Sequence, residues 1–234
     1  MIKNRALFEN TEEQLNLKRG IAEFRGCSME KMLSFPSRQM RSQEHIDDFI
    51  GHSLYKLFFD HKIGSLVYGR LLIPITTPSG FYISYVAYDV IAQIETRQTG
   101  EKKPSYIAPK DARKDSLVFV PDNHWAQVTE SDIIYVVDGV WDSITINYLG
   151  LPAMALLGSR VSDDITKILR LYKKIILVQD NDKAGVSLFI ELSKHFCNVS
   201  RVQIPASIAK DIDEFHNKTS DGEARNLLIR RQFI

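Results

Sequence analysis

Two short runs of mostly β-branched residues, 133–137 and 175–178, constrain this 234-residue chain more than any other feature. Continuous apolar runs of this kind are typical of strands buried on both faces, as in a parallel sheet. Each run leads into an acidic cluster: Asp138-Gly139-Val140-Trp141-Asp142 follows the first, and Asp180-Asn181-Asp182-Lys183-Ala184-Gly185 follows the second. Because open α/β sheets bind ligands beyond the carboxyl ends of their strands, we expect both clusters at one edge of a sheet.

Acidic side chains that converge on one edge repel each other unless a cation lies between them. The two clusters therefore predict a metal site. The simpler interpretation is that each cluster ends a strand or caps a helix, since Asp and Asn are common at both places. Both clusters occur in order, each directly after a buried-type strand, and this combination favours the metal site.

At these residues the chain resembles the Toprim domain, the metal-binding module of bacterial-type primases, topoisomerases and some nucleases. The family pattern is a glutamate followed by Gly-x-x-Asp, and then Asp-x-Asp on a later strand, often followed by Ala-Gly. The chain fits this pattern with one departure, because Asp138 stands where the family has glutamate.

The expected fold class is α/β, a Toprim fold in which a parallel-rich sheet is flanked by helices. Strand and helix patterns alternate from residue 131 to residue 205. The predicted strands are 133–138, 151–157, 174–180 and 199–205. The predicted helices between them are 142–149, 162–172 and 184–196, and a further helix is expected at 221–232.

A helical segment and a mixed α/β basic subdomain are expected to precede this fold. Helices are predicted over 10–35, with a break before Ser28, and over 44–63. Residues 69–75 and 81–88 predict a hairpin around the turn 77–80, and 97–104 predict a polar, basic loop. The resulting division is 1–65 for the N-terminal helical segment, 66–128 for the basic subdomain, 129–215 for the Toprim domain and 216–234 for a C-terminal helix.

Charge and cysteine usage narrow the class of protein. The net charge is only +1, but residues 1–114 are net basic and residues 115–234 are net acidic, an asymmetry that suits an enzyme acting on polyanions through cations. Two distant cysteines do not indicate a disulfide framework or a zinc site. We find no apolar run of about 18–20 residues and no secretory pattern, so the expected location is cytoplasmic, in the host cytoplasm if the chain is phage-encoded.

Three further motifs resemble the catalytic core of bacterial-type primases. Arg70 lies in a Gly-Arg-apolar-Pro-Ile strand, and Tyr106 follows Lys102-Lys103-Pro104 in the place of a Lys-Tyr-Leu-Asn-like strand. The second motif departs from the family at Ser105 and Ala108, where lysine and asparagine are expected. Residues 210–213 match the Lys-Asp-x-Asp motif of these primases.

The resemblance implies a set of site residues. The implied catalytic residues are Asp138, Asp180 and Asp182. The implied metal ligands are Asp138, Asp142, Asp180, Asp182, Asp211 and Asp213. The implied nucleotide-binding and template-binding residues are Arg70, Lys102, Lys103, Tyr106, Lys114, Arg160, Lys183 and Lys210. Carboxylates of this number suit Mg²⁺ or Mn²⁺; whether Asp138 acts as a base or as a metal ligand stays open.

The function implied is that of a DNA primase catalytic core, a DNA-directed RNA polymerase that makes short RNA primers on single-stranded DNA by two-metal nucleotidyl transfer. The implied partners are a single-stranded DNA template, ribonucleoside triphosphates, a replicative helicase and a separate zinc-binding subunit, as in phage or plasmid replication. Two alternatives stay open. One is a Toprim nuclease acting on RNA or DNA, and the other is a catalytically weak Toprim subunit that binds nucleic acid in a replication complex.

Overall fold

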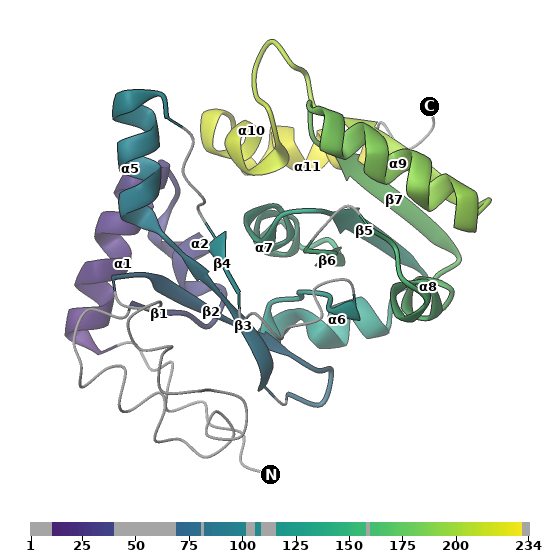
Figure 1. The fold of residues 1–234 in the computed structure, drawn as a ribbon, viewed down its shortest axis with the longest axis horizontal. Helices are drawn as coiled ribbons and strands as arrows, with labels where there is room; N and C mark the ends of the chain where they lie inside the picture. Colours follow the sequence, from purple (N-terminus) through teal and green to yellow (C-terminus); the bar gives the residue numbers. More distant parts are fainter. Residues whose placement is uncertain are drawn as a thin grey trace. The chain divides into compact units, whose positions relative to one another are not determined.

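The computed structural model describes residues 11–39, 69–80, 82–101, 106–108, 116–157 and 160–230. The chain forms two compact units, residues 1–112 and 113–234 (Figure 1). Within the described ranges, none of the helices has both the length and the apolar character needed to cross a membrane. The predicted helix 44–63 lies outside the described residues, as do Lys102, Lys103 and Lys114.

The first unit combines helices with a four-stranded antiparallel sheet of order β1-β2-β3-β4. Its elements are α1 (Glu12–Arg25), α2 (Met29–Leu33), β1 (Arg38–Gln39), β2 (Leu71–Thr76), β3 (Tyr82–Tyr88), α5 (Val90–Thr99) and β4 (Tyr106–Ile107). Thr11 caps α1 and Ser28 caps α2, each by accepting a hydrogen bond from a backbone N–H three residues on. The helices predicted over 10–35 and the β2–β3 hairpin are confirmed.

Helix α5 corrects the predicted loop, because residues 97–99 are helical. The Asp89 carboxylate accepts a hydrogen bond from the Ala92 N–H at 2.9 Å and so starts the helix. Gly100 ends it with φ 74°, a left-handed conformation that glycine adopts at little cost. Asp89, a residue type common at helix N-caps, is the sequence signal that indicates the start of this helix.

The second unit contains a parallel sheet of order β6-β5-β7-β8, which confirms the predicted α/β fold. Its strands are β5 (Ile133–Val137), β6 (Ala153–Ala155), β7 (Lys174–Gln179) and β8 (Val199–Gln203). Its helices are η4 (Asp122–His124), α6 (Trp125–Thr129), α7 (Val140–Tyr148), α8 (Asp163–Leu169), α9 (Lys183–His195), α10 (Ile212–Lys218) and α11 (Asp221–Arg230).

Apolar side chains cover both faces of this sheet, as the two β-branched runs predict. Ile134 and Leu177 belong to a core cluster that includes residues of α6, α8 and α9. The hydroxyl of Tyr135, the next residue along β5, donates to the Leu228 carbonyl in α11 at 3.4 Å. Figure 1 shows α7 on one side of the sheet and α8 and α9 on the other. The connections therefore change faces between β5 and β7, where open α/β sheets bind their ligands.

Residues 116–128 pack within the second unit, whereas the sequence-based division placed them in the basic subdomain. Val118 and Val120 are buried in the core cluster of the parallel sheet. Phe119 exchanges two backbone hydrogen bonds of 2.8 Å with Ala155 and so extends the sheet beyond β6. The assignment of separate functions to the four segments 1–65, 66–128, 129–215 and 216–234 stays a prediction.

Candidate metal centre

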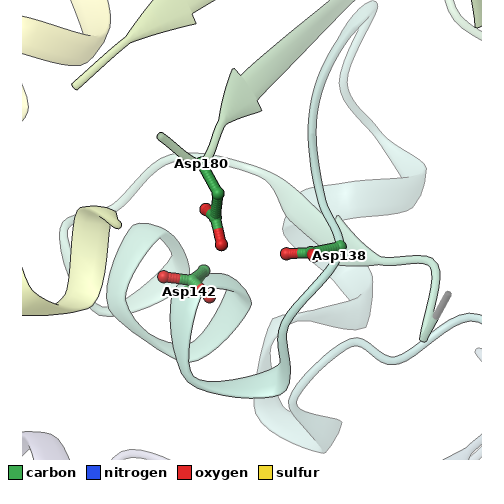
Figure 2. A group of neighbouring side chains, drawn as sticks. All are labelled: Asp138, Asp142 and Asp180. Carbon is green, nitrogen blue, oxygen red and sulfur yellow. The ribbon is translucent and has the colours of Figure 1, made fainter. Parts of the chain in front are cut away.

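Three carboxylates converge at the carboxyl edge of the parallel sheet. Asp138 directly follows β5, Asp142 lies in the first turn of α7, and Asp180 directly follows β7. One carboxylate oxygen from each lies within 4.8 Å of the other two. Figure 2 shows the three side chains grouped at this edge, with the carboxylates of Asp138 and Asp180 directed toward the space between them and Asp142. The sequence-based expectation that the two acidic clusters meet at one edge is confirmed.

Two glycines allow these carboxylates to come close. A Cβ atom at Gly139 would overlap the Asp142 carboxylate, so a side chain at residue 139 would displace it. A Cβ atom at Gly185 would lie 2.5 Å from the carbonyl oxygen of Asp180, which requires glycine where α9 passes the end of β7. The Gly-x-x-Asp and Ala-Gly parts of the motif therefore have a steric basis at this site.

The electrostatics of the three acids favour the binding of a cation. Burial, with the neighbouring Asp182 and Asp211, raises the pKa of Asp138. Burial and the surrounding carboxylates raise the pKa of Asp142 well above its usual range. Burial and the charges of Asp138 and Asp211 raise the pKa of Asp180 to about 8, although Lys210 partly offsets this. Grouped acids in this state bind a divalent cation in exchange for protons.

Asp182 and Asp211 are helix caps, as the simpler interpretation proposed for such residues. The Asp182 carboxylate accepts from the Gly185 N–H at 2.8 Å at the start of α9. The Asp211 carboxylate accepts from the Glu214 N–H at 2.7 Å at the start of α10. Each cap uses one carboxylate oxygen, and both acids lie near enough to raise the pKa of Asp138. Their predicted roles as metal ligands stay predictions.

Asp213 holds one member of the acid triad (Asp138, Asp142 and Asp180) in position through hydrogen bonds. It is buried and accepts a 2.8 Å hydrogen bond from the Thr145 hydroxyl on α7. Its backbone N–H donates to the Asp142 carboxylate at 3.2 Å. Asp213 therefore joins α10 to α7 and holds Asp142 in place, and Thr145 is a contributor that the sequence analysis missed.

Asn181, between Asp180 and Asp182, is the other residue that the sequence analysis missed. Its side-chain amide donates to the carbonyl oxygens of Ile204 and Ala209, both at 2.9 Å, and its backbone N–H donates to the Lys210 carbonyl at 2.9 Å. These three bonds fix the segment that carries Asp211 against the end of β7. No sequence pattern marks this role, because the partners are backbone groups more than twenty residues away.

The predicted basic residues lie in several places. Lys183 lines a hollow with Asp180 and Asp182. Lys210 forms a 3.1 Å ion pair with Asp211. Burial lowers the pKa of Lys210, but the charges of Asp211 and nearby acids together raise it by more, so the net shift of its pKa is upward. Arg160 is exposed ahead of α8.

Two predicted binding residues belong to the first unit. Arg70 forms a 2.7 Å ion pair with Asp89. The centroids of the Tyr106 and Tyr88 rings lie 5.3 Å apart, and Tyr106 is partly exposed. Neither arrangement identifies a ligand by itself, so the template-binding role of these residues stays a prediction.

Comparisons with known proteins agree with this geometry. Residues 135–216 match the family described as Toprim-like. The RNA polymerase domain of Mycobacterium tuberculosis primase DnaG superposes with a TM-score of 0.68 at 17% identity, covering 99% of this chain and 85% of that one. Aquifex aeolicus primase, with its zinc-binding and RNA polymerase domains, gives 0.68 at 20% identity, covering 97% of this chain and 61% of that one.

A DnaG primase catalytic domain bound to single-stranded DNA gives a TM-score of 0.62 at 17% identity, covering 95% of this chain and 78% of that one. No curated protein sequence matches the chain. At identities of 17–20% these likenesses establish the fold. The second unit therefore contains a Toprim-like domain, and the chain has the fold of primase RNA polymerase domains, as the sequence motifs indicated.

Proposed function

We propose that this chain is the catalytic core of a DNA primase and joins ribonucleotides on a single-stranded DNA template. The observation that carries the proposal is the convergence of Asp138, Asp142 and Asp180 at the switch point of the sheet. The fold supports it, because the match to primase RNA polymerase domains extends over almost the whole chain.

The acid triad fits hard divalent cations, because its donors are carboxylate oxygens from three separate elements. We propose Mg²⁺ or Mn²⁺ held by Asp138, Asp142 and Asp180, with Asp182 and Asp211 at the margin. When bound, such ions neutralise phosphate charge and favour ionisation of an attacking hydroxyl. Asp213 and Asn181 hold the ligands in position from outside, as supporting residues commonly do in metal sites.

The chain's own cations supply the contacts to the substrate in this proposal. Lys183 and Lys210 flank the acids and bind the triphosphate as point charges. Arg70, Tyr106 and the lysines at 102, 103 and 114 bind the template. The structure of a related DnaG catalytic domain with single-stranded DNA is consistent with this part of the proposal.

Partners complete the proposal. The Aquifex aeolicus structure contains a zinc-binding domain beside its RNA polymerase domain. The two cysteines of this chain, Cys27 and Cys197, are free. We propose that a zinc-bearing subunit and a replicative helicase stimulate the chain during priming.

A primer-synthesis assay tests the function. Labelled ribonucleoside triphosphates, single-stranded DNA and either Mg²⁺ or Mn²⁺ are incubated with the chain, with and without a helicase and a zinc-bearing subunit. We expect short labelled RNA products that disappear in Asp180→Ala. Cleavage of a labelled RNA or DNA strand instead would favour the nuclease. Binding of single-stranded DNA with no chemistry in either metal would favour a binding subunit.

A further inference from the structure

Helix α9 carries a row of mostly exposed residues, of which the proposed function uses only Lys183. The row runs with helical spacing along the face opposite the buried Leu188 and Leu192. Its members are Lys183, Val186, Ser187, Ile190, Glu191 and Lys194. We call this set the α9 row. Val186 is 44% exposed and Ile190 is 53% exposed, so two apolar side chains in its middle face solvent.

Two hollows lie along the α9 row and share Ser187. One, of about 680 Å³, is lined by Lys183, Val186 and the acids Asp180 and Asp182. The other, of about 570 Å³, is lined by Ile190, Lys194 and Arg160 from the segment before α8. Because Ser187 belongs to both, the row is a continuous path from the acid triad to Arg160.

We propose that the α9 row and Arg160 bind the sugar–phosphate backbone of a nucleic-acid strand that extends away from the acid triad. This inference rests on the proposed function and adds a path for the product strand. From Lys183 to Lys194 the helix rises about 16 Å. At a rise of 3.4 Å per nucleotide in one strand of a duplex, this length matches about five nucleotides.

The charges favour nucleic acid over a protein partner. Lys183, Lys194 and Arg160 place cations at both ends of the path, and Arg160 makes no ion pair with any described residue. Two exposed apolar side chains offer far less surface than the roughly 800 Å² per partner of a stable protein interface. Aliphatic side chains between cations suit the alternation of sugars and phosphates along a strand.

Glu191 opposes this role and provides an internal test. It pairs with Lys194 at 2.8 Å, so it neutralises part of the cationic end. Its replacement by glutamine should free Lys194 for a phosphate and strengthen binding. Changes at Glu191 and at Lys194 are therefore expected to act in opposite directions.

Hairpins that contain RNA–DNA hybrid stems of four and ten base pairs, with recessed 3′ ends, are the probes. Affinities are measured by fluorescence anisotropy over a range of salt concentrations. We expect Arg160→Ala with Lys194→Ala to weaken binding of the longer stem about ten-fold and to flatten the salt slope by about 2. The four-pair stem should be unaffected, because it does not reach these residues. Glu191→Gln should tighten binding of the longer stem.

Lys173→Ala and Arg225→Ala are the matched controls. Lys173 is exposed and paired with Asp132 at 2.8 Å, like Lys194 with Glu191, and Arg225 is exposed on α11. Equal losses for both stems, or an unchanged salt slope, would overturn the strand path. So would an Ile190→Asp variant that dissociates a dimer in sedimentation while hybrid binding stays intact, since this would identify a self-association face.

Binding needs no turnover, so this test is separate from that of the proposed function. Absence of primer synthesis combined with length-dependent binding would reject the polymerase and keep the path. Active primer synthesis, combined with hybrid binding that is unchanged by substitutions in the α9 row, would support the polymerase and reject the path.

Discussion

The amino and carboxyl edges of the parallel sheet both carry aspartate and asparagine residues, but these residues serve different purposes at the two edges. At the amino edge, Asp132 is exposed and pairs with Lys173 at 2.8 Å. Asn198 donates there to the carbonyls of Tyr172 and Lys173. At the carboxyl edge, Asn181 makes the equivalent pair of bonds, but the acids there are buried or half-buried close together and their pKa values are raised.

This difference separates structure from function. The amino edge is complete as it stands, because its acid has a cation and its asparagine ties two segments together. The carboxyl edge places buried and half-buried carboxylates side by side, an arrangement that opposes folding unless a ligand offsets it. We therefore expect parallel substitutions at the two edges to give similar structural effects and very different functional ones.

The largest expected difference is between Asp180→Ala and Asp132→Ala. Loss of a triad carboxylate should lower primer synthesis by at least 10²-fold, since misplacement of about 1 Å already has such an effect. Asp138→Ala should be equally inactive while the fold is kept. Asp132→Ala should retain full activity in Mg²⁺ and in Mn²⁺. Circular dichroism of each variant is the control for folding.

Asp138→Glu sharpens this prediction, because glutamate is the residue of the Toprim family at this position. The site is built around the shorter side chain, so we expect intermediate activity. Wild-type activity in Asp138→Ala beside an inactive Asp180→Ala would remove Asp138 from the mechanism.

The next largest difference is expected between the two asparagines. Asn181→Ala and Asn198→Ala each leave two carbonyls without their donor, which costs about 1–3 kcal/mol of stability in either variant. Only Asn181→Ala releases the segment that carries Asp211, so it should raise the half-saturating Mg²⁺ concentration about 10–100-fold. Equal Mg²⁺ requirements in the two variants would show that Asn181 is merely structural.

Stability should depend on pH in a direction set by Asp180. Its pKa is raised to about 8 in the folded chain, above the ordinary value of 3.8. The folded state therefore holds the proton more tightly, and the contribution to stability is present below pH 4 and lost as the pH rises toward 8. Without metal, Asp180→Asn should exceed the wild type at pH 8 by at least 1 kcal/mol, or about 2–4 °C in Tm.

Metal should reverse this dependence. Added Mg²⁺ competes with protons for the triad, so its stabilising effect should grow between pH 6 and pH 8.5 and disappear in Asp180→Asn. Thermal unfolding with Mg²⁺ and with a chelator measures both arms. A Tm gain from Mg²⁺ that persists in Asp180→Asn would place the ion elsewhere.

The convergence of the acids could be predicted because it depends on a simple rule. Strands of one direction end at one edge, so residues that follow two buried strands must meet, and Asp138 and Asp180 do. The supporting contacts could not be predicted in this way. Asn181 binds backbone carbonyls, and Thr145 binds Asp213 across 68 residues, so both depend on how loops fold back over the sheet.

The fold shows the same division. The caps at Thr11 and Ser28 are local signals, and the helices that begin there were predicted. The placement of residues 116–128 depends on contacts distant in sequence, namely the bridge between Phe119 and Ala155 and the burial of Val118 and Val120 in the core of the parallel sheet, and a short apolar segment does not indicate these partners. Helix caps can therefore be predicted from the sequence, because their contacts are local. Whether residues 116–128 join the core of the first unit or that of the second unit depends on packing, which the sequence does not show.

The smallest effects are expected from two lysines of nearly equal exposure, Lys173 and Lys210, whose side chains are 78% and 77% exposed. Each pairs with an aspartate near the sheet, so either alanine variant should change stability by less than about 1 kcal/mol. The two should differ in function alone. The charge of Lys210 acts to lower the pKa of Asp180, and in the proposed function Lys210 binds the triphosphate, so Lys210→Ala should raise the nucleotide KM in primer synthesis. Lys173→Ala should leave that KM unchanged. Equal KM values in both variants at low salt would mean that Lys210 serves the α10 cap and does not contact the nucleotide, because screening is weakest under that condition.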